Sequence, residues 1–182
     1  HRQKNALAFI YHDDSHYYYK SKLIPFFEKR LLTAPTHSLP IPLLSHSVLL
    51  GPSLCYEILF PHISRRHTRN GAGIIGCFAF NTWFGHSNWP YLHLSYFPLR
   101  CSENNRYGFF LNNNGPSVIC DTTGRFLSYL PINEEGIIHY NIPIRHDLSL
   151  FTRYGASWLW CLLLLLGCYP NPLHDICHWF KS

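Results

Sequence analysis

Short apolar runs separated by polar turns indicate alternating strands and helices in the first part of the chain. The runs at residues 5–10, 47–54 and 74–80 have the length of buried strands. A polar turn follows the first run at residues 12–15, and four prolines between residues 33 and 53 predict an irregular connection into the second. Pro61 suits the first turn of a helix that ends at Asn70, before Gly71. The pattern therefore predicts strand–helix–strand units.

The next part of the chain has the pattern of a helix followed by a β-meander. A mixed segment ending at Arg106 is predicted to be helical, with a kink at Pro98. Residues 107–111, 117–120 and 125–130 are predicted strands, because turn residues separate them. We expect a last strand over residues 136–142. Alternating strands and helices followed by a meander favour an α/β layered domain.

The C-terminal segment has a different pattern. Residues 156–169 carry no charge, but this run is shorter than the ~20 residues that cross a hydrocarbon layer of ~30 Å. Length alone favours a buried core helix. Trp158 and Trp160 at one end and Trp179 beyond the other resemble the aromatic belts of membrane helices. We therefore expect a catalytic-type domain over residues 1–149 and a membrane helix with a short tail over residues 150–182.

Composition indicates a folded domain and argues against nucleic-acid binding. Apolar residues make up 47% of the 182 residues, which is enough for a sizeable core. The net charge is +5, but only 14% of residues are charged and the basic ones are scattered, so a nucleic-acid surface is not expected. The absence of Met and the abrupt strand-like start suggest a fragment of a longer protein.

The seven cysteines follow no regular spacing and form no C-x-x-C pair. This argues against a disulfide framework or a zinc site, and most of them are expected to be small buried side chains. Cys55 differs because it stands between a predicted strand and a predicted helix. A sharp turn there exposes a nucleophile and directs backbone N–H groups at a developing oxyanion. A structural cysteine remains the alternative on this tripeptide alone.

Lys20 and Glu28 lie in an otherwise apolar stretch that contains Pro25. A buried Lys would be a good partner for an oxyanion or a carboxylate. A solvated Lys beside a proline turn is the alternative. Glu28 precedes two basic residues and has the local pattern of an ordinary surface ion pair.

Taken in order, several motifs resemble the apolipoprotein N-acyltransferases of the nitrilase, or carbon-nitrogen hydrolase, superfamily. The order is K-x-K-L-x-P-x-x-E, C-Y-E, W-F-G, H-L, E-N-x-R and N-x-G-x-S. The matching text is Lys20–Glu28, Cys55–Pro61, Trp83–Gly85, His93–Leu94, Glu103–Arg106 and Asn113–Ser117. The resemblance covers about residues 20–170, the C-terminal part of such a protein, and the ordered set is more specific than any single motif.

The resemblance implies a partial nitrilase-like αββα sandwich followed by a C-terminal transmembrane helix. Enzymes of this family use a Glu-Lys-Cys triad, and Cys55 would take an acyl chain from a phospholipid as a thioester. Lys20 matches the triad Lys that stabilises the oxyanion, and Trp83 matches an aromatic residue beside the acyl site. The remaining matched active-site positions are Glu28, Tyr56 and Glu57.

The same resemblance implies the partners and the location. The acceptor is the amine of a lipid-modified apolipoprotein, and no cofactor, metal or nucleic acid is implied. The protein would be a monomer in the bacterial inner membrane, with its catalytic domain on the periplasmic side.

The chain also departs from the family pattern. No Glu precedes Glu28, so the general base of the triad is missing from these residues. Phe27 replaces a small residue, Phe80-Asn81 replaces Asn-Asp, and the stretch from Glu28 to Cys55 is short. A nitrilase-like amidase and a non-catalytic membrane fragment or pseudoenzyme therefore remain as alternative functions.

Overall fold

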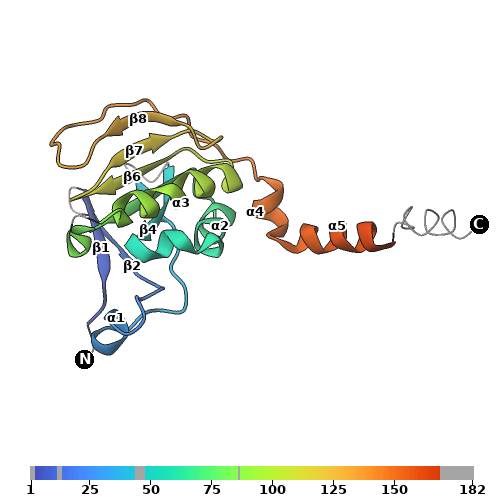
Figure 1. Ribbon diagram of the computed structural model, residues 1–182, viewed down its shortest axis with the longest axis horizontal. Coiled ribbons are helices and arrows are strands. Elements are labelled where there is room, and N and C mark those ends of the chain that lie inside the picture. Colours follow the sequence, from blue (N-terminus) through green and yellow to red (C-terminus); the bar gives the residue numbers. More distant parts are fainter. Residues whose placement is uncertain (1–2, 12–13, 44–47, 86, 169–182) are drawn as a thin grey trace, which may run out of the picture.

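A computed structural model describes residues 3–11, 14–43, 48–85 and 87–168, and Figure 1 shows the arrangement. One mixed sheet forms the centre, with two helices on one face and a hairpin toward the N-terminus. The sheet has six strands in the order β3-β4-β5-β6-β7-β8. Their bounds are Ile41–Leu43, Val48–Leu54, Ile74–Ala79, Gly108–Asn112, Ser117–Cys120 and Phe126–Leu130. The expected α/β layered class is confirmed.

The central strands β4, β5 and β6 are parallel, and all other neighbours in this sheet are antiparallel. Parallel neighbours need crossover connections, and helices α2 (Pro61–Arg69) and α3 (Trp89–Asn104) supply them. Because β4, β5 and β6 follow one another in space as in sequence, two right-handed crossovers place both helices on the same face. Pro98 lies inside α3, where the sequence predicted a kink.

Two clusters of buried side chains lie on opposite faces of this sheet. On the helix side, Ile58, Phe97 and Phe110 pack with three buried cysteines, Cys77, Cys101 and Cys120. This confirms the expectation that these cysteines are small buried side chains. The other cluster contains Tyr18, Leu50 and Leu54. The approach of α2 to β4 is close, because a Cβ on Gly51 would lie 2.7 Å from the Cβ of His67.

The second face of the sheet is covered by a hairpin and by the segment after β8. Strands β1 (Ala6–Tyr11) and β2 (Asp14–Tyr19) form a separate two-stranded antiparallel sheet. The first of these strands was predicted, but the second was not, and its first two residues were assigned to the polar turn over residues 12–15. A groove of about 810 Å³ opens on this face between strands β5–β8 and residues 134–142, and neither Cys55 nor Lys20 lines it.

The prediction of a strand over residues 136–142 is wrong, because this segment has no regular structure. Its residues line the groove over the face of the sheet and do not pair along the edge of β8. Ile137 is 84% exposed, so the apolar positions of this run do not all face the core. The proline-rich connection is also more ordered than expected, since it contains β3 and is preceded by a single helical turn, α1 (Glu28–Leu31).

The C-terminal segment consists of two short helices, α4 (Leu150–Tyr154) and α5 (Ser157–Cys168), which extend away from the sheet (Figure 1). Gly155, at φ +66°, ends α4. The 12 residues of α5 rise about 18 Å at ~1.5 Å per residue, short of the ~30 Å hydrocarbon layer. No helix within the described ranges is long and apolar enough to cross a membrane. The expected spanning helix is therefore not found there, and residues 169–182 of that expectation lie outside the described residues.

Candidate active site

Cys55 lies where the central strand β4 ends. It begins η1, a 3₁₀ turn over Cys55–Leu59, and its backbone has φ +49°. A non-glycine residue in this left-handed region is strained and persists only where its surroundings hold it. The thiol is free and the residue is partly exposed, unlike the buried Cys77, Cys101 and Cys120. The turn therefore presents Cys55 at the carboxyl end of a parallel strand, where open α/β sheets bind ligands.

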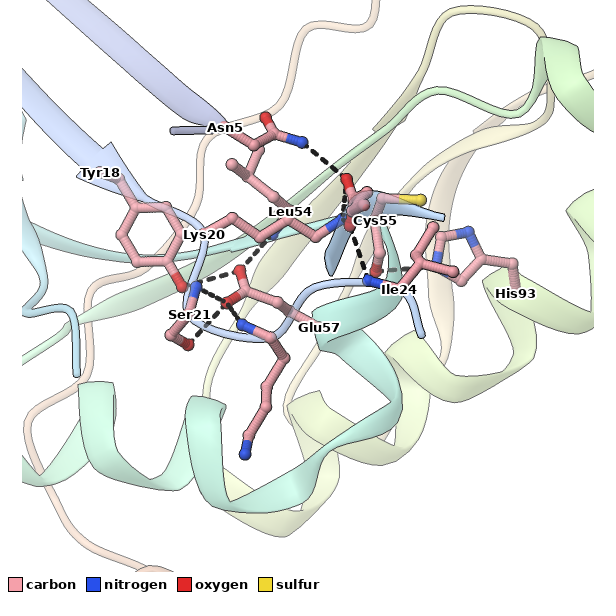
Figure 2. A network of polar contacts seen from close by, with 11 residues as sticks. Asn5, Tyr18, Lys20, Ser21, Ile24, Leu54, Cys55, Glu57 and His93 are labelled. Atoms are coloured by element: carbon pink, nitrogen blue, oxygen red, sulfur yellow. Dashed lines mark hydrogen bonds and ion pairs between the residues drawn. The ribbon is translucent and has the colours of Figure 1, made fainter. Parts of the chain in front are cut away.

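The Glu57 carboxylate, fully buried two residues after Cys55, is held by hydrogen bonds from five donors (Figure 2). Within the turn, its Oε2 accepts from the backbone N–H of Leu54 at 2.9 Å. The other four are the Tyr18 hydroxyl at 2.9 Å, the Ser21 N–H at 2.6 Å, the Ser21 hydroxyl at 2.7 Å and the Lys22 N–H at 3.1 Å. A buried carboxylate requires such a complete set of donors.

These contacts make Glu57 the link between two segments far apart in sequence. Tyr18, Ser21 and Lys22 flank Lys20, whereas Leu54 and Glu57 flank Cys55. The position of the Lys20 backbone relative to Cys55 is thus fixed through one buried carboxylate. Burial, together with the neighbouring Glu57 charge, raises the pKa of Tyr18 well above its usual value. Tyr18 therefore remains a hydrogen-bond donor across the physiological pH range.

Lys20 is buried, with 2% of its surface exposed, and forms an ion pair with Glu28. Its Nζ lies 2.9 and 2.8 Å from the two oxygens of the Glu28 carboxylate. Glu28 also accepts from the Asn5 amide at 2.9 Å and from the Ile24 N–H at 2.7 Å. Burial alone would raise the pKa of Glu28, but the hydrogen bonds from Lys20 and Ile24 outweigh it and lower that pKa.

The Lys20 ammonium reaches the neighbourhood of Cys55, as Figure 2 shows. Burial and, to a smaller extent, the charge of Lys20 lower the pKa of His93, the residue that is hydrogen-bonded to the Cys55 carbonyl. Glu57 thus brings the free thiol of Cys55 and the cation of Lys20 into one region near the end of β4. Such a pair can attack a carbonyl carbon and stabilise the negative oxygen that results.

Of the six residues selected from the sequence, four lie in one region and two, Tyr56 and Trp83, have other surroundings. The structure brings Cys55, Lys20, Glu28 and Glu57 into one region. Tyr56, on the same turn, packs its ring against Phe60 with centroids 5.1 Å apart. Trp83 lies on a different turn, η2 (Thr82–Phe84), after the end of β5. Among the described residues, no group of three or more His, Cys, Asp or Glu side chains is placed to hold a metal ion.

Sequence reasoning missed four polar partners of this site, of which Ser21 donates to Glu57 across 36 positions of sequence. Tyr18 meets Glu57 across 39 positions of sequence, Asn5 meets Glu28 across 23, and His93 meets Cys55 across 38. No local pattern identifies contacts of this range. His93 was noted only as part of a motif, without a role.

Comparisons with known proteins identify the family of this chain and its fold. The carbon-nitrogen hydrolase family model matches residues 4–146, and the chain belongs to that family. Similar solved structures include a carbon-nitrogen hydrolase from Helicobacter pylori, with TM-score 0.58 and 18% identity over 66% of this chain and 50% of that one. An amidase from Nesterenkonia sp. gives TM-score 0.52 and 22% identity over 65% and 46%. These likenesses show the nitrilase-like fold.

Within this family, the chain is similar to proteins named apolipoprotein N-acyltransferase. The one from Shewanella oneidensis is 32% identical over 127 residues, which cover 68% of this chain and 24% of the relative. That of Geobacter metallireducens is 29% identical over 111 residues, 61% of this chain and 21% of the relative. A third, from Vibrio parahaemolyticus, is 25% identical over 88% of this chain and 35% of the relative. The chain thus spans about a third or less of the length of these relatives.

Proposed function

We propose that this chain carries the nucleophile and oxyanion-binding part of a phospholipid-dependent N-acyltransferase of bacterial lipoprotein maturation. The observation that supports the proposal is that buried Glu57 ties the segment of the buried Lys20 to the strained turn of Cys55. The names of the relatives support the choice of acyl transfer within a family whose fold also serves amidases.

In the first half-reaction, the Cys55 sulfur attacks the ester carbonyl carbon of a phospholipid. The carbonyl oxygen becomes an oxyanion next to the Lys20 ammonium, which stabilises it electrostatically. The C–O bond then breaks, the lysophospholipid leaves with the proton that the thiol gave up, and a thioester remains on Cys55. A thiolate is a good nucleophile and a good leaving group, which suits an intermediate that must be formed and resolved.

In the second half-reaction, the amine of a lipid-modified apolipoprotein attacks the thioester carbon. A second oxyanion forms at the same place beside Lys20, and the C–S bond breaks to give an amide and the free thiol. The amine loses one proton in this step and the Cys55 sulfur regains one. Glu28 keeps Lys20 in position throughout, and Tyr56 and Trp83 belong to the acyl side of the site.

The apolar surface of α5 supports a bilayer as the source of both substrates. Trp160 is 69% exposed, and Leu163, Leu164 and Leu165 are 57, 67 and 70% exposed. A patch of this kind is unusual on a protein surface that faces only water. Our proposal places the protein at the bacterial inner membrane as a monomer, with the catalytic domain on the periplasmic side.

The test is the intact mass of the detergent-purified chain after incubation with phosphatidylethanolamine, with Cys55→Ala as the matched control. We expect a fatty-acyl adduct that hydroxylamine removes and that the variant lacks. Within the described ranges, neither Glu28 nor Glu57 is hydrogen-bonded to the Cys55 thiol. No Glu precedes Glu28 in this sequence, so an adduct on this chain alone would mean that a group other than the family's general-base Glu accepts the thiol proton.

Other outcomes separate the remaining candidates. An adduct that water resolves as fast as it forms would favour a hydrolase of the amidase type. Absence of any adduct would contradict acyl transfer by this chain and favour a non-catalytic role. A Lys20→Met variant keeps much of the buried volume but removes the charge, so thioester formation should become at least ~10-fold slower, in line with the loss of one oxyanion donor.

A further inference from the structure

The side chain of His93 forms a hydrogen bond to the backbone of Cys55 itself. It lies on α3, is 1% exposed, and its Nε2 is 2.9 Å from the carbonyl oxygen of Cys55 (Figure 2). The ring also packs edge-on against Phe110, with centroids 5.4 Å apart at 81°. His93 thus reaches from the helix layer to the turn that carries the thiol.

The partners of the ring determine its tautomer. A carbonyl oxygen can only accept, so Nε2 must carry the proton. Nδ1 is buried and has no hydrogen-bond partner in the described part of the chain. Protonating it would bury an unpaired N–H, and burial together with the charge of Lys20 lowers the pKa of His93 despite its bond to Cys55. The ring is therefore a neutral Nε2–H donor.

The strained backbone of the turn at Cys55 is held by hydrogen bonds on both sides. With φ at +49°, the residue is in a conformation that an L-amino acid adopts only under constraint. Glu57 holds the N–H of Leu54 before the cysteine at 2.9 Å, and His93 holds the carbonyl of Cys55 on the other side at 2.9 Å. Two buried groups, one from the turn and one from α3, thus constrain the backbone on both sides of the nucleophile.

We propose that His93 is a positioning residue for Cys55, which holds the cysteine carbonyl so that the thiol is aligned for attack on a carbonyl whose oxygen faces Lys20. This deepens the proposed function, since it rests on Cys55 being the nucleophile. His93 takes no proton from the thiol, because its Nε2 already carries one and its Nδ1 is enclosed. Its contribution is to the geometry of acylation and not to the basicity of the site.

Two rates on the same thiol separate alignment from simple reactivity. Acylation of Cys55 by a p-nitrophenyl ester requires attack on a carbonyl next to the oxyanion site, whereas alkylation by iodoacetamide does not. Peptide mass mapping measures modification of Cys55 separately from that of the buried cysteines. Alkylation of the buried cysteines would indicate unfolding. The ratio of the two rates is the measured quantity.

The variants are His93→Gln, which keeps an N–H donor at a similar reach, and His93→Leu, which keeps volume but cannot donate. We expect His93→Leu to lower the acylation-to-alkylation ratio about 10-fold or more, as a misplaced reacting group does. His93→Gln should stay within about threefold of the parent, since its amide can replace the ring N–H. Leu94→Ala, a buried neighbour on α3, should lower stability and leave the ratio unchanged.

An unchanged ratio in His93→Leu would overturn the inference, as would a loss in His93→Gln equal to that in His93→Leu. A parent chain that is alkylated but not acylated at Cys55 would also overturn it. Failure of the proposed function is read separately, because phosphatidylethanolamine takes no part in either reaction. A chain that the activated ester acylates and the phospholipid does not would lose its proposed donor but retain the role of His93.

Discussion

The ammonium of Lys20 is shared between both oxygens of the Glu28 carboxylate, at 2.9 and 2.8 Å, in a site where Lys20 is almost completely buried. Eight positions separate the two residues, and the sequence around Glu28 resembles a surface ion pair. The fold instead buries Lys20 just after β2 and leaves Glu28, at the start of α1, partly buried. The net contribution of such a pair to stability is small, but removing one partner is strongly destabilising. The remaining charge is then left buried without a partner.

Glu28→Gln should therefore destabilise the protein although it keeps the size of the side chain. We expect the free energy of unfolding to fall by about 3–5 kcal/mol, the range for breaking a buried ion pair. Urea denaturation followed by circular dichroism measures it. Glu134→Gln, at an exposed position, is the control and should change stability by no more than about 0.5 kcal/mol. Equal effects in the two variants would show that the Lys20 charge is not buried in solution.

Tyr18→Phe should loosen the link between the Lys20 segment and the Cys55 turn. It removes the hydroxyl that donates to Glu57 at 2.9 Å and leaves a buried carboxylate oxygen with one donor fewer. We expect a loss of about 1–3 kcal/mol in unfolding free energy. The hairpin offers a matched control in Tyr17→Phe, since Tyr17 is 53% exposed and stacks on Tyr19 through its ring alone. A neutral Tyr18→Phe would remove Glu57 as the organising group of the site.

The parts of the fold that the sequence predicted are those that depend on neighbouring residues. Strands β4 and β5 and helix α2 follow from continuous apolar runs, Pro61 and Gly71, and the meander follows from its turns. The strand expected over residues 136–142 failed because apolar alternation does not reveal whether a sheet edge is open to pair with it. Tyr18 was missed because its burial depends on how β2 packs against α2, where its ring lies against His67 at 5.6 Å.

The candidate site was predicted unevenly for a similar reason. The position of Cys55 between a strand and a helix was predicted from the pattern, and the structure places it at the end of β4. Its choice as the nucleophile rested on the resemblance. Lys20, Glu28 and Glu57 were selected by resemblance to a family, because their local patterns are those of surface charges. Only the contacts across 8 and 35–39 positions show what buries them.

Stability should depend on pH through His67. This ring is 1% exposed, and burial, helped by the charge of Arg66, lowers its pKa from 6.5 to about 4. Between pH 4 and 6.5 His67 is protonated in the unfolded chain but neutral in the folded chain. The unfolding free energy therefore falls as the pH is lowered through this window. The difference corresponds to about 3 kcal/mol between the two limits.

Unfolding free energies of the parent and of His67→Gln, measured from pH 7 to pH 4, test this dependence. Gln does not titrate, so the variant should show a flatter profile, even if its stability at pH 7 is lower. His139→Gln changes an exposed histidine and should keep the parent's slope. Parallel profiles for the parent and His67→Gln would mean that the buried ring does not control acid stability. Glu28 contributes to stability only while it is ionised. This contribution is lost at lower pH, because the pKa of Glu28 in the folded chain lies below its ordinary value of 4.5.

The direction in which α5 leaves the domain depends on Arg65. Its guanidinium, on α2, donates to three successive carbonyls of α4, from Nε to Phe151 and Thr152 and from Nη2 to Arg153, each at 3.0 Å. The Thr152 and Arg153 carbonyls belong to the last turn of α4, where backbone acceptors lack partners within the helix. The Phe151 carbonyl also accepts from the Gly155 N–H. Gly155 then turns the chain at φ +66°, and a Cβ there would lie 3.1 Å from the Arg65 guanidinium carbon.

Arg65→Lys should release α4 without unfolding the domain, because an ammonium cannot donate to three carbonyls in this planar geometry. We expect hydrogen exchange at the amides of Arg153 and Gly155, which close the turns of α4, to become roughly 10-fold faster. Global stability should fall by about 1–3 kcal/mol. Arg69→Lys, exposed at the end of the same helix, should change neither quantity. Unchanged exchange in α4 would show that its contacts with α3 suffice to hold the base of the apolar helix. These are the Asn104–Thr152 hydrogen bond of 3.1 Å and the bond from the Ser149 hydroxyl to the Glu103 carbonyl.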